Sequence, residues 1–589
     1  MQQVLFMQTV PPSPGSPTAL PLAFDRGLLA CSASVVLSIG AAALLAAIHA
    51  HLLPMPRSAF IVAQLVTLAA VVSLIARWLK TVLQARPALA VIRLLPLALF
   101  VGLSSSMMLS GFSRHDEIYS WNLWAIQHFS HIPYDRTYTQ AAYPQLYAYW
   151  LASIYGAQGQ FESQLLTRFA SAIPSLVMIG VAGAFWPQGV RADRRSVTIA
   201  ALVTLLVLLG TFSTLRLSYA DPLMTAALLT SAALLLCHAS APSTLVYLVP
   251  GVTCGVIAAL TKQPAILWAG GILPLAVAGG VWRRSWPWRS LLIAALGAAV
   301  TGSWLLLELS AMLNNQGVVQ AGLGDRGLMA TAAKAGLKYL IKKPHLLLLL
   351  SAGWYVSRRD AWLHALWWLG VLPMLALWFT LGSYEARHGT HVLWFSALIL
   401  LAALSLRPTA DTSMPSFDCG KIAIASPLTM VGSFLVIALT FGLTFSVAHR
   451  KGLNLFDGQR LAWLAQISPQ GSAFFDAAIR KQSRIWTTSN YNYGIFYGRL
   501  PVGRPSRYAP DSTPLEIARE LQDFHADFAI SAGRFAYGVH SSLLLRLVEA
   551  CPNSLHQVLV SDDGEFVVFS VNQNELPHCV EELNARVAD

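Results

Sequence analysis

Two adjacent carboxylic acids, Asp116 and Glu117, follow directly after a long apolar run. A carboxylate held at the level of the lipid headgroups can deprotonate an acceptor hydroxyl, while its neighbour orients polar substrate groups. Lipid-linked substrates present their reactive bond at this depth. The alternative interpretation is an interfacial anchor, because charged residues end a membrane span at the surface and aromatic residues such as Trp121 and Trp124 favour the headgroup region.

The rest of the chain indicates how such a pair would be positioned. Hydrophobic residues make up 55% of the 589 residues and charged residues only 12%, about half the charged share of an ordinary soluble domain. The net charge of +12 lies in short basic clusters between apolar runs, which indicates an orientation in the membrane rather than a nucleic-acid surface. The composition therefore predicts an α-helical polytopic membrane protein.

Apolar runs close to the roughly 20 residues needed to cross a bilayer recur along the chain. They predict about thirteen spans, of which the run at 345–357 is the shortest: 28–53, 59–76, 94–111, 169–186, 197–213, 222–238, 244–260, 264–282, 290–311, 345–357, 361–381, 391–406 and 425–447.

Every second connection between these spans is basic, which predicts a cytoplasmic N-terminus by the positive-inside rule. The basic connections contain Arg77, Lys80, Arg86 and Arg93, then Arg191, Arg194 and Arg195, then Arg283, Arg284 and Arg289, then Arg358 and Arg359. The opposite, extracytoplasmic face then receives the loops at 112–168 and 312–344, the turn at 382–391 and everything after Ala448.

These boundaries divide the chain into four parts. Residues 1–111 hold three spans, 112–168 form the first outer loop with the acid pair, 169–448 complete the membrane core, and 449–589 form a polar domain. The aromatic segment from Tyr143 to Trp150 favours amphipathic helices that lie along the membrane surface.

The polar tail has the pattern of a small α/β domain. Strands are predicted at Arg484–Thr488, Phe528–Ser531, Gln557–Val560 and Phe566–Val571, with a hairpin turn at Asp563-Gly564. Thr513 and Glu516 fit a capping box that opens a helix through Phe524.

The cysteine pattern favours a disulfide in this tail over a metal site. No Cys-x-x-Cys or Cys/His metal spacing occurs in the sequence. Cys551 and Cys579 are the only cysteines of the tail, and they can pair if the domain lies in an oxidising compartment.

Several segments together resemble one branch of the GT-C-type glycosyltransferases, the branch containing protein mannosyltransferases and the lipid A aminoarabinose transferase. The likeness covers roughly Asp116 to Arg387. Its motifs follow in the same order: Asp116-Glu117 after a span, Tyr143-Pro144-Gln145-Leu146-Tyr147, Tyr155-Gly156, Ser218-Tyr219-Ala220-Asp221-Pro222 and Leu260-Thr261-Lys262-Gln263-Pro264. The chain departs from the branch in having about two spans before the span that precedes Asp116.

The resemblance implies transfer of a sugar from a polyprenyl-phosphate donor to an acceptor hydroxyl on an envelope lipid, glycan or protein at the outer face of the inner membrane. Asp116 would be the general base, which gives direct displacement at the anomeric carbon with inversion. Glu117 would hold the acceptor or a divalent metal ion.

Further residues of the matched segments are predicted to contact the substrates. Lys262 and Arg387 would stabilise charge on the lipid phosphate that leaves, and the alternative for each is a span-end cation that snorkels to the headgroups. Asp221 would accept hydrogen bonds from sugar hydroxyls, and its alternatives are a helix cap or a pair with Arg216. Tyr143 and Tyr219 complete the predicted substrate site.

Two other functional classes also fit a chain with many spans. A multi-span transporter is the main rival, although its polar residues would be expected near the bilayer midplane rather than at one face. A non-catalytic subunit of envelope polysaccharide export is the second. Membrane lipids are partners under every interpretation, and nucleic acid under none.

Overall fold

The structure of the protein is a computed structural model, and it describes most of the helical core and parts of the C-terminal region. The described residues are 24–83, 87–109, 117–131, 144–160, 165–187, 194–215, 218–240, 245–268, 288, 291–300, 326–358, 360–382, 386–406, 474, 477–478, 480–481, 483–487, 502–503, 513–532, 541–560 and 566–588.

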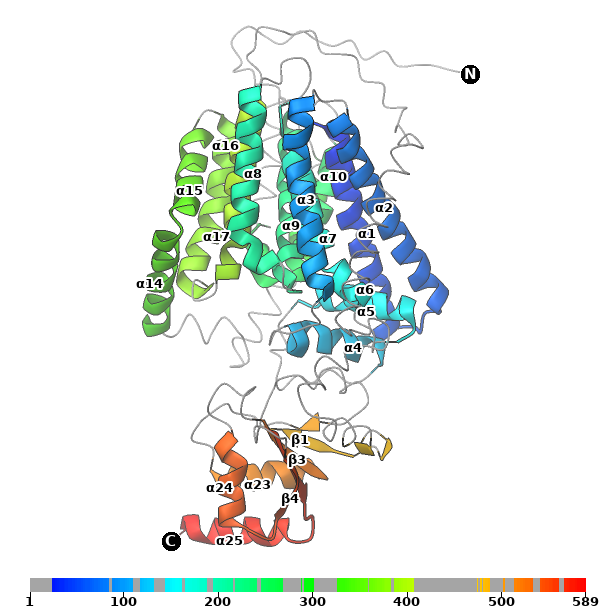
Figure 1. Ribbon diagram of the computed structural model, residues 1–589, viewed down its shortest axis with the longest axis vertical. Coiled ribbons are helices and arrows are strands. Elements are labelled where there is room, and N and C mark those ends of the chain that lie inside the picture. The colour runs from blue at the N-terminus through cyan, green and yellow to red at the C-terminus, as the bar shows by residue number, and fades with distance from the viewer. Residues whose placement is uncertain are drawn as a thin grey trace.

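A bundle of long apolar helices forms the larger part of the molecule (Figure 1). Its helices are α1 (Arg26–His51), α2 (Arg57–Leu83), α3 (Pro87–Leu109), η1 (Glu117–Asn122), α4 (Leu123–Phe129), α5 (Leu146–Gln158), α6 (Leu165–Ala170), α7 (Ile173–Ala184), α8 (Arg194–Leu215), α9 (Ala220–Ser240), α10 (Leu245–Thr261), η2 (Gln263–Ala265), α14 (Arg326–Lys342), α15 (Pro344–Ser357), α16 (Ala361–Leu366), η3 (Trp367–Val371), α17 (Leu372–Leu377), η4 (Trp378–Gly382), η5 (Ala386–Gly389) and α18 (Thr390–Leu404).

Within the described residues, seven helices are long and apolar enough to cross a membrane. They are Arg26–His51, Arg57–Leu83, Leu166–Ala184, Arg194–Leu215, Ala220–Ala239, Ala361–Thr380 and Arg387–Leu404, and each matches a span predicted from the sequence. The predicted span at 94–111 overlaps α3, whose apolar part is Ile92–Ser104, and those at 244–260 and 345–357 match the shorter helices α10 and α15. The run at 290–311 is described only over Leu291–Val300, and those at 264–282 and 425–447 lie wholly or mostly outside the described residues.

Helix α9 is the centre of the bundle. Its most apolar stretch is completely buried, whereas only 33% of the corresponding stretch of α2 is buried. The outward face of α2 carries exposed apolar side chains, among them Val62, Leu65 and Val66. Such a face requires an apolar solvent, because exposed apolar surface of this extent is rare in water.

Charged and polar side chains close the bundle at its two ends. At one end, Arg77 bonds Asp25 at 2.8 Å and Arg93 bonds the carbonyl of Pro187 at 3.0 Å. At the other end, Arg57 donates to the carbonyls of Ala157 and Gln158 at the end of α5. The helices α4, α5 and α6 gather at this second end (Figure 1), which is the end that the sequence predicts to be extracytoplasmic.

Two segments of the predicted outer face differ from the sequence-based expectation. The helix α5 is buried around nearly its whole circumference, including Tyr147, Trp150, Leu151 and Tyr155, because α1, α2 and α4 pack around it. It is therefore not an amphipathic helix lying on a surface. The second segment, predicted as a loop at 312–344, contains the helix α14.

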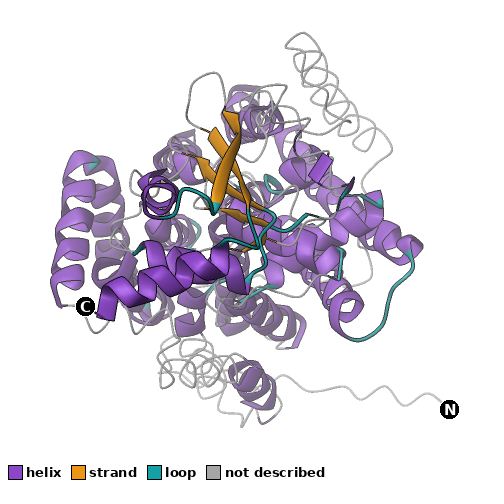
Figure 2. Ribbon diagram, turned by 90° about the horizontal axis from the view of Figure 1, so that it is seen from below, coloured by secondary structure: helices purple, strands orange, loops and turns teal. Residues whose placement is uncertain are grey.

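The C-terminal region folds as a mixed five-stranded sheet with helices. Its elements are β1 (Ile485–Thr487), β2 (Val502–Gly503), α23 (Pro514–Asp523), β3 (Phe528–Ala532), α24 (Ser541–Ala550), β4 (Leu555–Val560), β5 (Phe566–Val571) and α25 (Leu576–Ala588). The strand order is β2-β1-β3-β5-β4, with β1 parallel to both of its neighbours and the pairs β3-β5 and β5-β4 antiparallel. Figure 1 shows this region below the helix bundle, and Figure 2 shows its strands in the view from below.

Several predictions for this domain are confirmed. Each of the four predicted strands matches an observed strand. Thr513 accepts from the Glu516 N–H, and the Glu516 carboxylate accepts from the Thr513 N–H, so the predicted capping box opens α23. Cys551 and Cys579 form a disulfide. The turn predicted at Asp563-Gly564 lies outside the described residues, although the two strands that it would join are paired.

Candidate active site

Five parts of the chain, far apart in sequence, bring polar side chains to one end of the bundle. Glu117 begins η1, Arg168 lies in α6, Asp221 lies in the first turn of α9, and Lys262 follows the end of α10. Arg387 lies in η5, directly before α18. Because α9 is the central helix, its first turn is the point at which these segments can meet.

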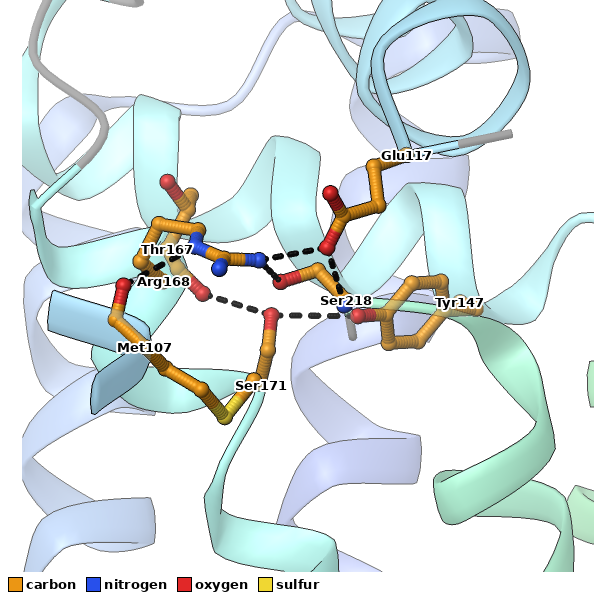
Figure 3. A network of polar contacts seen from close by, with 7 residues as sticks. All are labelled: Met107, Glu117, Tyr147, Thr167, Arg168, Ser171 and Ser218. Atoms are coloured by element: carbon orange, nitrogen blue, oxygen red, sulfur yellow. Dashed lines mark hydrogen bonds and ion pairs between the residues drawn. The ribbon is translucent and has the colours of Figure 1, made fainter. Parts of the chain in front are cut away.

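A buried network joins the first outer loop to the start of α9 (Figure 3). The Nη1 atom of Arg168 lies 2.6 Å from Oε1 of Glu117 and 2.5 Å from Oγ of Ser218. The backbone N–H of Ser218 donates to the same Glu117 oxygen at 2.6 Å. Arg168 also donates from Nε to the carbonyl of Met107 at 3.1 Å, which ties in the end of α3.

Burial makes this ion pair depend on its hydrogen bonds. Glu117 is 0% exposed and Arg168 is 1% exposed, and an ion pair withdrawn from water is stable only when further hydrogen bonds offset the lost hydration. The planar guanidinium supplies them, because it presents several donors in a fixed geometry. An equivalent lysine could not hold Glu117, Ser218 and Met107 together.

A second set of bonds fixes the short helices of the loop to one another. The Tyr147 hydroxyl of α5 donates to Ser171 Oγ at 3.0 Å, and Ser171 Oγ donates to the Thr167 carbonyl at 2.8 Å. Tyr155 donates to Asn122 Oδ1, which connects α5 with the end of η1. The segment that follows Asp116 is therefore held from both α5 and α6.

The structure shows which groups engage the Glu117 carboxylate. The sequence predicted that this carboxylate holds an acceptor or a divalent metal ion. In the structure its Oε1 atom accepts from Arg168 and from the Ser218 N–H. Asp116, the predicted base, is the immediate neighbour of Glu117 and lies outside the described residues.

Asp221 and Lys262 form the second buried ion pair. The Lys262 ammonium donates to both carboxylate oxygens of Asp221, at 2.7 and 2.8 Å, and the two residues are 1% and 5% exposed. Lys262 has an extended backbone where α10 ends, which turns its side chain away from the helix path. Asp221 thus pairs with Lys262, whereas the sequence offered Arg216, which is outside the described residues.

Arg387 and Tyr219 meet beside this pair. The Arg387 guanidinium carbon lies 4.2 Å from the centre of the Tyr219 ring, within the range of a cation–π contact. Tyr219 is two residues from Asp221, so the predicted substrate residues Tyr219, Asp221, Lys262 and Arg387 are brought together. Tyr143, the remaining one, is outside the described residues.

Two further residues belong to this end of the bundle. Arg168 could not be recognised from the sequence as the partner of Glu117, because a single arginine beside an apolar run gives no local signal of its partners. His391 was not singled out at all, because it lies at the start of an apolar span. It is 2% exposed, and neither ring nitrogen has a hydrogen-bond partner in the described part of the chain.

The described residues contain no group of three or more His, Cys, Asp or Glu side chains that could hold a metal ion. Next to Asp221 they bring together two cations, Lys262 and Arg387. This arrangement is suited to binding an anionic group such as a phosphate.

Comparison of the sequence with models of known protein families finds no match. Comparison with curated proteins likewise finds no relative.

Proposed function

We propose that the chain is a GT-C-type membrane glycosyltransferase that moves a sugar from a polyprenyl-phosphate donor to an acceptor hydroxyl on an envelope lipid, glycan or protein. One observation carries the proposal. The Asp221–Lys262 pair and the Arg387–Tyr219 contact lie at the same end of the bundle as the segment that begins at Glu117. A base and a phosphate-binding group must face the same side of the membrane for this reaction.

In the proposed reaction, the Asp116 carboxylate takes the proton of the acceptor hydroxyl. The acceptor oxygen forms a bond to the anomeric carbon from the side opposite the phosphate, and the bond from that carbon to the phosphate oxygen breaks. Its electron pair stays on the lipid phosphate. The sugar is transferred with inversion.

The charges of the site suit this step. Lys262 and Arg387 supply two positive charges beside Asp221, so the lipid phosphate that leaves would lie next to two cations. Asp221 keeps the Lys262 ammonium fixed before the substrate arrives, and a preoriented charge stabilises developing negative charge without reorganisation during the reaction. We propose that the buried Glu117–Arg168 pair positions Asp116, the residue directly before Glu117.

The proposal includes a cellular location and a membrane topology. The chain would lie in the inner membrane with about thirteen spans, a cytoplasmic N-terminus and an extracytoplasmic C-terminal domain. The long apolar helices support a membrane location, and the opposite placement of the Arg77 and Lys262 ends of the bundle supports two chemically different faces.

The test is a transfer assay on the purified full chain in liposomes. Undecaprenyl-phosphate-linked mannose, glucose and aminoarabinose serve as donors, and transfer is followed by release of undecaprenyl phosphate in the presence of envelope lipid, glycan and protein acceptors. The unsubstituted chain should turn over at least one donor. Asp116→Asn should lower turnover by roughly 10²- to 10⁴-fold, as loss of a general base does, while donor binding is retained.

Asp135→Asn is the matched control, because it removes another carboxylate of the same loop and should leave turnover unchanged. If folded Asp116→Asn protein turns over at a near-normal rate, Asp116 is not the base. If no donor is consumed by the unsubstituted chain, and the liposomes instead take up or release a lipid-linked glycan, the transporter or export-subunit alternative replaces the transferase.

A further inference from the structure

Helix α14 carries a row of lysines on its exposed side. Lys334, Lys338 and Lys342 are spaced four residues apart, which places them on one face of a helix. All three are exposed. The sequence of α14 contains no acidic residue, and none of the three lysines has an ion pair within the described part of the chain. The row is therefore an uncompensated strip of positive charge.

Apolar side chains lie beside this strip on the same exposed side. Leu337 is 56% exposed and Ile341 is 64% exposed. The opposite face of α14 is the one that packs against the protein, through Ala332 and Leu340. An exposed helix face that combines lysines with adjacent large apolar residues is typical of the boundary between lipid headgroups and acyl chains.

The position of α14 agrees with this assignment. The helix lies directly before α15, separated from it only by Lys343, and extends towards the end of the bundle where α4 lies (Figure 1). Tyr339 of α14 packs edge-on against Trp378 of η4, with ring centres 5.9 Å apart. This contact fixes α14 against the rest of the bundle, with Trp378 buried between them.

The same contact connects α14 to the candidate active site. A Cβ atom at Gly389 would lie 2.8 Å from Cε2 of Trp378, so the close approach of this ring requires glycine. Gly389 ends η5, the short helix that holds Arg387 over Tyr219. The lysine helix is therefore connected to the segment that holds Arg387 through the packing of Tyr339, Trp378 and Gly389.

We propose that the exposed face formed by Lys334, Leu337, Lys338, Ile341 and Lys342 is a docking surface for the headgroups of anionic phospholipids in the surrounding bilayer leaflet. The lysines bind the lipid phosphates and the two apolar residues contact the upper acyl chains. Each lysine near an anionic membrane surface adds a similar amount to the electrostatic attraction between protein and lipid. This attraction becomes weaker as the salt concentration rises. This inference is independent of the proposed transferase activity.

Native mass spectrometry of the full chain, titrated in detergent with phosphatidylglycerol or with phosphatidylcholine, tests the proposal. The chain should bind phosphatidylglycerol more tightly than phosphatidylcholine. Replacing the three lysines together, as Lys334→Gln/Lys338→Gln/Lys342→Gln, should weaken phosphatidylglycerol binding by roughly fivefold for each charge removed. Binding of phosphatidylcholine should not change.

Two control variants separate charge on α14 from charge elsewhere. Lys334→Arg/Lys338→Arg/Lys342→Arg should keep the preference for phosphatidylglycerol, and so should Arg480→Gln/Lys481→Gln, which removes two exposed cations from the C-terminal region. The thermal melting point of each variant in phosphatidylcholine should equal that of the unsubstituted chain, because all the replaced side chains are exposed. If the triple glutamine variant melts lower, the single variant Lys338→Gln provides the same comparison.

A photoactivatable phosphatidylglycerol supplies the second measurement. Its label should be recovered in a peptide from 326–343 of the unsubstituted chain, and should be reduced there in the triple glutamine variant. Equal affinity of the unsubstituted chain for the two lipids, full binding by the triple glutamine variant, or labelling confined to other helices would each overturn the proposal.

Discussion

The Nζ atom of Lys262 lies 2.7 Å from Oδ1 of Asp221 and 2.8 Å from Oδ2. One ammonium group thus contacts both oxygens of one carboxylate, between the first turn of α9 and the end of α10. Because both residues are nearly inaccessible to water, removing either charge leaves the other buried without this partner.

We expect Asp221→Asn to destabilise the protein by about 3–5 kcal/mol, the usual cost of breaking a buried ion pair from one side. The double variant Asp221→Asn/Lys262→Met should recover part of that loss, because it removes the stranded ammonium. Thermal unfolding of the detergent-solubilised chain measures both. A double variant no more stable than Asp221→Asn would show that the pair does not determine the stability of this region.

The Glu117–Arg168 pair gives a separate prediction about the first outer loop. Arg168→Lys should be almost as damaging as Arg168→Met. Arg168 bonds Met107 from Nε and bonds Glu117 and Ser218 from Nη1, and the single nitrogen of an ammonium cannot occupy both positions. Limited proteolysis should show earlier cleavage within 112–168 in both variants. Arg77→Gln is the matched control, because its pair with Asp25 lies at the other end of the bundle and Arg77 is 33% exposed. Unchanged proteolysis of 112–168 in both Arg168 variants would rule out a positioning role.

His128 should make the stability of the protein depend on pH. Burial lowers the pKa of His128 to about 4, although its contact with Gln145 raises the pKa and His51 lowers it further. A histidine with a pKa near 6.5 in the unfolded chain and a lower pKa in the folded protein takes up protons preferentially on unfolding. The contribution of neutral His128 to the free energy of unfolding is complete above pH 6.5. It is lost as the pH falls from 6.5 towards 4, by up to about 3 kcal/mol.

His128→Phe should flatten this pH dependence while keeping the stacking against Tyr149, whose ring centre lies 4.1 Å from that of His128. His556→Gln changes an exposed histidine of β4 and should leave the dependence as it is. Melting curves between pH 4 and pH 8 compare the two variants. Equal slopes in the unsubstituted chain and in His128→Phe would contradict the assignment.

The disulfide between Cys551 and Cys579 should stabilise the C-terminal domain. It closes a loop with a sequence separation of 28 residues, and the chain-entropy model gives about 3–4 kcal/mol for a loop of this length. Cys551→Ser/Cys579→Ser should lower the melting point of the domain, while the helical signal of the bundle melts as before. Mass spectrometry without reductant should find the two cysteines linked, and recovery of both as free thiols would refute the pairing in the isolated protein.

Reporter fusions should place the two ends of the bundle on opposite sides of the membrane. Alkaline phosphatase fused after Asp589 should be active, because the basic connections predict an extracytoplasmic C-terminal domain. The same reporter fused after a truncation at Ala192 should be inactive. Activity in the second fusion and not in the first would reverse the orientation and move the proposed active face to the cytoplasm.

The sequence by itself determined the elements whose signals are local. Crossing a bilayer requires a long apolar run, so spans such as those of α1 and α9 could be predicted from composition within a short window. The capping box of Thr513 and Glu516 depends on residues three positions apart. Cys551 and Cys579 could be paired by elimination, because the polar tail contains no other cysteine.

Only the tertiary structure decided which side chains meet. Asp221 had Arg216 nearby in sequence and Lys262 41 positions away, and the packing of α9 against α10 selected the distant partner. The burial of Glu117 by Arg168 and of α5 by α1 and α2 likewise depends on helices that are separate in sequence. The physical reason lies in what each signal depends on. Hydropathy depends on the transfer of side chains from water to an apolar solvent, and capping depends on bonds within one helical turn. Ion pairing between helices depends on their relative rotation and depth, which no local pattern encodes.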